Sequence, residues 1–293
     1  MKLITCLFFA FSLYARGPLP PGQPLALLAA RILGGAGLCQ RAAVDDGTGR
    51  LFVPDSGGVL VTDLEGLRLG EVPGIRGATS VALAPELGIG ICSCGRSNTL
   101  AVFNLASLVV EKELRTTGGA PGAVVFDPAN RRIFAFNERG RNATAFDAFG
   151  GAVAGSIPLG GRPGAAAADG EGRVFVCLPE TPVVLVLDTW RLTVLRRIPV
   201  DAPAGPSGLA LDPGRRRLFL AGAETLAVLE TDTGRLRGIL RVGPEAVGAA
   251  CAPDTGAVFV PHRGGTVTVV RPGPAGDYQV AGSLPGLPFP GPS

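Results

Sequence analysis

The sequence contains one histidine, His262, and this scarcity limits the chemistry that a single chain can perform. One imidazole excludes a metal site built from several histidines and a haem held by two histidines, and a Ser-His-Asp triad would have to use His262. The chain also lacks a G-x-S-x-G elbow, a C-x-x-C-H haem attachment motif and a glycine-rich phosphate loop before a helix. We therefore nominate no catalytic residue, and we expect no metal and no cofactor.

Lysine is nearly absent too, since it occurs only as Lys2 and Lys112 and arginine supplies the other basic side chains. The formal net charge of +3 and the pI near 8.6 fall short of the strong basicity of a dedicated nucleic-acid binder. Nucleic acid is therefore a less favoured partner than a protein, a surface polymer or a small anionic ligand.

Long apolar runs are lacking except at the N-terminus. Lys2 precedes an apolar run from Leu3 to Ala15, which is the layout of a secretory signal peptide. Leu13 departs from the small residue usual at the −3 position of a cleavage site after Ala15, and an apolar N-terminal extension is the alternative. We expect residues 1–23 to be a signal peptide and leader. The mature protein would then be periplasmic or secreted, with no membrane span.

Glycine and proline, in contrast, are abundant. The chain has 44 Gly and 26 Pro while 46% of its residues are hydrophobic. Helix breakers at this frequency, combined with enough apolar residues for a core, favour many short strands joined by tight turns. The composition therefore predicts a globular all-β protein.

A short pattern of strand, turn and strand recurs along the chain. The stretches FDPANRRIFAF (126–136) and LDPGRRRLFLA (211–221) show it most clearly. Aligned turns fall at Asp45, Ala84, Asp127, Asp169, Asp212 and Ala252, which are 39 to 43 residues apart. Proline after the aspartate fixes φ and cannot donate to a sheet, so it ends one strand and begins a turn. We expect the arginines beside these turns to be solvated, because exposed ion pairs contribute less than about 1 kcal/mol.

Each repeat contains four short strands, which is the content of one β-propeller blade. The third strand alternates apolar and small residues, as in ATAFD (143–147) and VLVLD (184–188). The predicted blades cover residues 37–74, 77–117, 120–160, 162–203, 205–243 and 246–284. Residues 24–285 are thus expected to form the propeller, and residues 286–293 a disordered tail rich in Pro and Gly.

The repeats resemble a known class. Residues 159–200 are similar to a YVTN β-propeller repeat, and residues 77–108 to a stretch of the bacterial YncE-like proteins. The resemblance covers about residues 25–283. It implies an exported propeller, commonly of seven blades, in a family whose members mostly have no established enzymatic role.

The number of blades visible in this sequence differs from the seven that are common in that family. Six blades are visible, and the Pro/Gly tail cannot supply the strands of a seventh. Residues 25–35 nevertheless resemble an outer strand. We favour an incomplete seventh blade over a six-bladed ring with an added edge strand.

Cysteine gives no disulfide pattern. Cys92 and Cys94 lie two apart on one predicted strand, and Cys177 and Cys251 fall in blades that are not adjacent. This spacing predicts free and mostly buried thiols.

The predicted binding site lies in the loops between second and third strands, which share one face of a propeller with the blade-to-blade connections. The candidate residues are Arg96, Asn98, Asn137, Arg139, Arg141, His262 and Arg263. Guanidinium groups pair with carboxylates and other anions, so Arg96, Arg139 and Arg141 are the expected anion contacts.

The favoured function is an exported, non-catalytic propeller that acts as a binding scaffold. One alternative is a propeller enzyme or cofactor-binding protein with its site at the channel mouth, because a fold does not fix a function. The other is a truncated relative without function.

Overall fold

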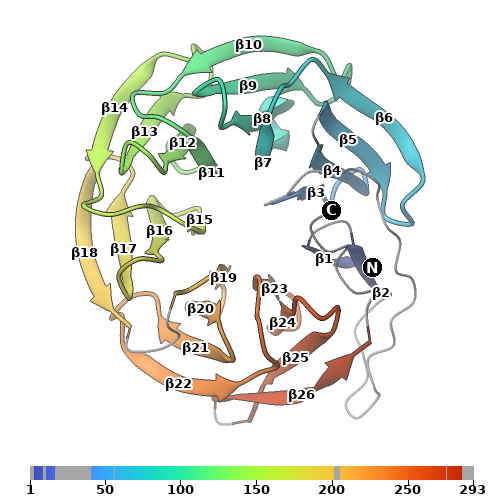
Figure 1. The fold of residues 1–293 in the computed structure, drawn as a ribbon, viewed down its shortest axis with the longest axis vertical. Helices are drawn as coiled ribbons and strands as arrows, with labels where there is room; N and C mark the ends of the chain where they lie inside the picture. Colours follow the sequence, from blue (N-terminus) through green and yellow to red (C-terminus); the bar gives the residue numbers. More distant parts are fainter. Residues whose placement is uncertain are drawn as a thin grey trace.

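The protein is a ring of six four-stranded antiparallel sheets, shown along its shortest axis in Figure 1. The computed structural model describes residues 3–8, 11–16, 41–55, 57–200, 205–274 and 276–285. Six blades of four strands were predicted, and this fold is confirmed. The predicted strand at 25–35 and the predicted tail at 286–293 lie outside the described residues.

Each blade uses its four strands in chain order from the centre of the ring outward (Figure 1). The inner strands are β3 (Ala43–Asp45), β7 (Ala78–Ala84), β11 (Pro121–Asp127), β15 (Ala166–Ala168), β19 (Gly208–Asp212) and β23 (Ala250–Ala252). The second strands are β4 (Arg50–Asp55), β8 (Ile89–Cys94), β12 (Arg132–Asn137), β16 (Arg173–Leu178), β20 (Arg217–Gly222) and β24 (Ala257–Pro261).

The third and outer strands complete each sheet. The third strands are β5 (Gly58–Asp63), β9 (Thr99–Asn104), β13 (Asn142–Asp147), β17 (Val183–Asp188), β21 (Thr225–Glu230) and β25 (Val267–Pro272). The outer strands are β6 (Arg68–Pro73), β10 (Val110–Arg115), β14 (Val153–Pro158), β18 (Thr193–Pro199), β22 (Leu236–Arg241) and β26 (Tyr278–Leu284). The pairing between third and outer strands shifts register in every one of these blades. Such bulges increase the local twist, and the twist lets the rim of each blade turn over its neighbour.

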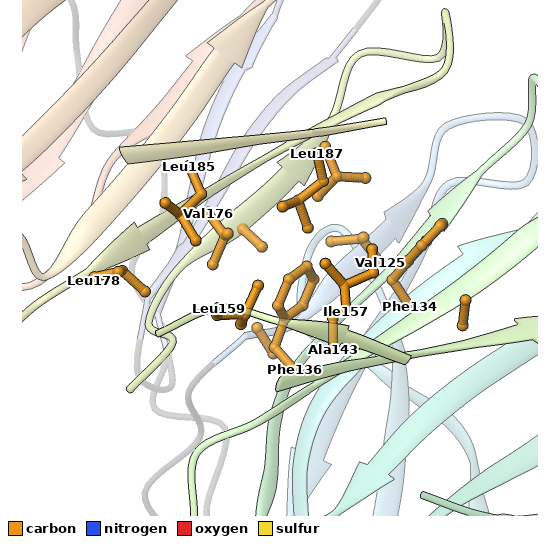
Figure 2. Close-up of a cluster of buried hydrophobic side chains, with 14 residues drawn as sticks. Val125, Phe134, Phe136, Ala143, Ile157, Leu159, Val176, Leu178, Leu185 and Leu187 are labelled. Carbon is orange, nitrogen blue, oxygen red and sulfur yellow. The ribbon is translucent and has the colours of Figure 1, made fainter. Parts of the chain in front are cut away.

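The core lies between blades rather than inside one sheet. Figure 2 shows the cluster between blades three and four, in which Phe134, Phe136 and Ile157 of blade three pack with Val176 and Leu185 of blade four. Similar clusters join blades one and two, two and three, four and five, and five and six. Alternating side chains supply both faces of every middle strand, so each of blades two to five is stabilised by the apolar area it buries against two neighbouring blades, and blades one and six each by the area buried against one.

The ring is interrupted between blade six and blade one. Each of these blades has a separate small cluster on its free side, around Phe259 in blade six and around Leu51 in blade one. A hairpin of β1 (Leu3–Phe8) and β2 (Phe11–Arg16) lies in this interval, with β1 next to β23 (Figure 1). A two-stranded hairpin thus stands where a closed ring of seven would place another blade. It consists of the residues that the sequence predicts to be a signal peptide.

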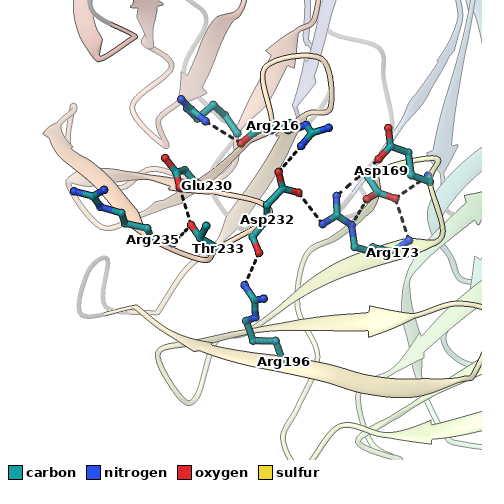
Figure 3. A network of polar contacts seen from close by, with 10 residues as sticks. Asp169, Arg173, Arg196, Arg216, Glu230, Asp232, Thr233 and Arg235 are labelled. Carbon is teal, nitrogen blue, oxygen red and sulfur yellow. Dashed lines mark hydrogen bonds and ion pairs between the residues drawn. The ribbon is translucent and has the colours of Figure 1, made fainter.

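Arginines at the first positions of second strands connect neighbouring blades. Arg50 donates to the carbonyl of Leu105 at 2.7 Å, and Arg132 donates to that of Thr189 at 2.5 Å. In Figure 3, Arg173 of blade four reaches Asp232 of blade five at 3.0 Å. The expectation that these arginines are merely solvated is therefore wrong. They sit above the gap between blades, where the next blade offers carbonyl and carboxylate acceptors within reach.

Candidate ligand-binding face

One face of the ring carries the loops between second and third strands together with the connections between blades. We call it the loop face, and the opposite face the turn face. On the loop face, the connection before β11 joins the loops of blades two and three. The amide of Ala120 donates to Oδ1 of Asn98 at 2.8 Å, and the amide of Arg139 donates to the carbonyl of Gly119 at 3.0 Å. Asn98 and Arg139 therefore lie on two sides of one connection, as the sequence predicted for neighbouring blades.

Three exposed arginines of these loops lack an acidic partner. Arg96, Arg139 and Arg141 are exposed, and none of the ion pairs among the described residues includes them. Arg96 packs its aliphatic stem on Gly77, where an added Cβ would meet its Cγ at 3.1 Å. Glu138, the acidic residue of the blade-three loop, is already paired with Arg162. The face over blades two and three therefore carries uncompensated positive charge.

The two asparagines of the predicted site hold the loops in place. Asn98 adopts a left-handed conformation with φ of 60°, and its side chain accepts the Ala120 bond. Asn137 is fully buried, and its Nδ2 donates to Oγ1 of Thr144 at 2.9 Å and to Oδ1 of Asn142 at 3.1 Å. A ligand on the surface would not reach Asn137 without opening this part of blade three.

Sequence reasoning missed the hydroxyl and amide cluster around Asn137. The amide of Thr117 donates to Oγ1 of Thr144 at 3.0 Å, and Nδ2 of Asn142 donates to Oγ of Ser156 at 2.7 Å. Only the adjacency of Asn142 and Thr144 gave any hint, because the other members come from the blade connection and the outer strand. The cluster rigidifies the base of the loop that presents Arg139 and Arg141.

His262 and Arg263 lie in blade six, away from blades two and three in Figure 1. His262 is 1% exposed. Its Nδ1 lies 2.9 Å from the carbonyl of Pro244, which can only accept, so Nδ1 carries the hydrogen and Nε2 accepts from Oγ1 of Thr268 at 2.8 Å. Arg263 is exposed and lies 3.6 Å from Glu245. The structure thus does not bring these two residues together with the three free arginines.

Groups that support catalysis or metal binding are not assembled in the part of the chain that the structure describes. No set of three His, Cys, Asp or Glu side chains there could hold a metal ion. Cys94, Cys177 and Cys251 are free thiols, and Cys92, Cys94 and Cys177 are buried, as predicted. Burial raises the pKa of Cys177 to about 11 and that of Cys251 to about 12, which keeps both thiols protonated and poorly nucleophilic at neutral pH. Within the same residues, no helix has the length and apolar character needed to cross a membrane.

Known structures place this architecture among the β-propellers. No protein-family model matches the sequence, and no curated protein matches it either. Similar solved structures include hydrazine synthase of Kuenenia stuttgartiensis, with a TM-score of 0.71 at 14% identity over 85% of this chain and 86% of that one. The structure of U3-55K matches with a TM-score of 0.74 at 12% identity, over 85% of this chain and 82% of that one.

A third structure, the WD40 repeats of RRP9, gives a TM-score of 0.75 at 11% identity, over 85% of this chain and 81% of that one. At these identities the likeness shows the fold alone. The chain is a β-propeller protein built from repeats, and its function has to be argued from its own residues.

Proposed function

We propose that the protein is an exported, non-catalytic propeller of the YVTN-repeat, YncE-like kind, and that its loop face binds an anionic partner. The observation that carries the proposal is a group of exposed arginines that form no ion pair with any residue the structure describes, namely Arg96, Arg139 and Arg141. The amide of Arg139 donates to the carbonyl of Gly119 at 3.0 Å, and the carbonyl of Arg141 accepts from the amide of Leu159 at 3.0 Å. Next to Arg96, the amide of Gly95 donates to the carbonyl of Gly77 at 3.2 Å, so the guanidinium groups extend from loops whose backbones are bonded to the blades. Preorganised arginines of this kind favour carboxylate-rich partners, such as an acidic protein segment or an anionic surface polymer.

A scaffold role fits the rest of the molecule. No set of three metal-ligating side chains gathers among the described residues, and the hydroxyl that donates to the imidazole of His262, that of Thr268, is buried with it. The loop face, in contrast, offers arginines that form no ion pair with any described residue. The WD40 structures that resemble this chain are propellers as well, which supports a repeat architecture suited to presenting loops. The resemblance to YncE-like repeats and the apolar N-terminus support export.

The test compares two triple variants of equal charge change. R96A/R139A/R141A removes the free arginines of the loop face, and R131A/R191A/R235A removes three arginines of the turn face. Binding to poly-L-glutamate, measured by calorimetry at low salt, should weaken at least about tenfold in the first variant and far less in the second, because only the first set is on the proposed site.

If binding of poly-L-glutamate weakens equally in both triple variants, net charge alone drives binding. That result would reject Arg96, Arg139 and Arg141 as the binding site. A DNA duplex serves as a second probe. Tighter binding of DNA than of the polymer, lost in the first variant, would replace the proposed partner class with nucleic acid.

A further inference from the structure

Arg41 lies at the centre of the loop face, just before the inner strand of blade one. Its carbonyl accepts a hydrogen bond from the amide of Val81 at 3.0 Å, in an isolated bridge with Ser80 of β7. The inner strands surround the centre of the ring, and each enters it from the loop face (Figure 1). The backbone of Arg41 is thereby bonded to the inner strand of blade two, at the end of the central space that is nearer to the loop face.

The side chain of Arg41 reaches past blade three. Its Nη1 donates to the carbonyl of Ala166 at 2.7 Å, at the first residue of β15 in blade four. The thiol of Cys177 on β16 lies close enough to interact electrostatically with the guanidinium. A side chain that joins blades two and four, which are not adjacent, must cross the central space of the ring.

The charge of Arg41 is not balanced. Among the described residues no carboxylate forms an ion pair with it, whereas Arg173 has both Asp169 and Asp232. Arg41 is partly buried, and this burial lowers the pKa of its guanidinium, although arginine remains charged at neutral pH. Cys177 does not neutralise it, because burial raises the pKa of that thiol to about 11. A desolvated charge without a counter-ion is costly, and an anion supplied from solution would remove that cost.

The guanidinium of Arg41 has donors to spare. It carries five N–H groups, and the only bond that the described residues accept from it uses one of them. The free part of this planar fork matches a carboxylate held by two parallel bonds.

We propose that Arg41 binds the carboxylate of a small organic acid at the centre of the loop face. This site does not include Arg96, Arg139 or Arg141. A failure to bind the anionic partner proposed above would therefore leave the Arg41 proposal intact, and the reverse is also true.

The experiment is a thermal melt of the full chain titrated with sodium butyrate to about 50 mM, which is about fifty times a millimolar dissociation constant. Sodium chloride at equal ionic strength and n-butanol serve as controls for charge and for the apolar chain of butyrate. We expect a saturable rise in melting temperature with butyrate alone. The rise should persist in R96A/R139A/R141A and disappear in R41M, which keeps most of the side-chain volume without the charge.

A second readout covers the case in which R41M fails to fold. R41K keeps a charge but loses the planar fork, so line broadening of carboxyl-labelled butyrate in NMR should be weaker with R41K than with the native chain. The proposal is overturned if butyrate gives no shift in the native chain, or if R41M or R41K responds as the native chain does.

Discussion

His262 is a polar residue of the predicted site that the fold uses internally. Its ring lies between the connection at Pro244 and the third strand at Thr268, and both nitrogens are engaged. The sequence VPHRGG locates a turn correctly but does not say which way the side chain points. Contact with a ligand would require these two bonds to break, so the three free arginines are better candidates.

Burial lowers the pKa of His262, and the bond to Pro244 opposes this only in part. The unfolded chain, with a histidine pKa of about 6.5, binds a proton before the folded chain does. The buried, neutral imidazole of His262 thus contributes fully to the stability of the folded chain above about pH 6.5. This contribution is lost as the pH falls below about 6.5. Because the chain has a single histidine, NMR of the ring protons can follow it alone. We expect a titration midpoint below 6.5 in the native chain and near 6.5 in urea, and a native midpoint at or above 6.5 would contradict the assignment.

At the scale of elements, arginines of the turn face add ion pairs and hydrogen bonds to the apolar contacts between blades. Arg173 is held by Asp169 within its blade at 2.6 Å and by Asp232 of the next blade at 3.0 Å (Figure 3). Asp232 is also bound by Arg216 at 2.8 Å, and its carbonyl accepts from Arg196 at 2.7 Å. One carboxylate at the start of a turn therefore joins two blades.

Replacing Arg173 by alanine should lower the free energy of unfolding by about 2 kcal/mol, because Asp169 is buried and would lose its charged partner. The matched control is R235A, which removes an exposed arginine from a turn of blade five and should change the same quantity by less than about 0.5 kcal/mol. Urea unfolding followed by circular dichroism measures both. A loss in R173A as small as that in R235A would show that the contact between blades contributes nothing.

For the whole molecule, the interval between blades six and one is the main departure from a closed ring. The hairpin β1–β2 occupies it beside β23 (Figure 1). If residues 1–23 are a signal peptide and leader, as we propose, export removes this hairpin and leaves the free sides of both blades to other contacts. The apolar sheet faces around Phe259 and Leu51 would then favour association with another chain.

The export proposal predicts a mature protein that begins after Ala15 and no later than about residue 24. N-terminal sequencing of protein recovered from the periplasm or medium of a bacterial host checks this. The control is a variant with Leu7 replaced by arginine, which interrupts the apolar run and should hold the uncleaved chain in the cytoplasm. Intact Met1 in correctly folded protein outside the cell would contradict the prediction.

The sequence by itself determined the repeat, the six four-stranded blades and nearly all of their strand positions, but it left open whether a seventh blade is incomplete. Turns such as Asp127-Pro128 and alternating strands such as β17 depend on neighbouring residues, so their signals are local. The sequence also located the loops of Arg96 and Arg139, because strand order places second-to-third loops on one face.

Only the tertiary structure decided what the long polar side chains touch. Arg41 reaches the carbonyl of Ala166, Arg132 that of Thr189, and Asn137 turns into blade three rather than toward a ligand. The partners of these two arginines lie 57 to 125 residues away in the chain, on blades that come near only when the ring forms. The physical reason is the reach of the side chain. An arginine spans the distance between blades, and its hydrogen-bond partner is whatever acceptor the packed ring presents there.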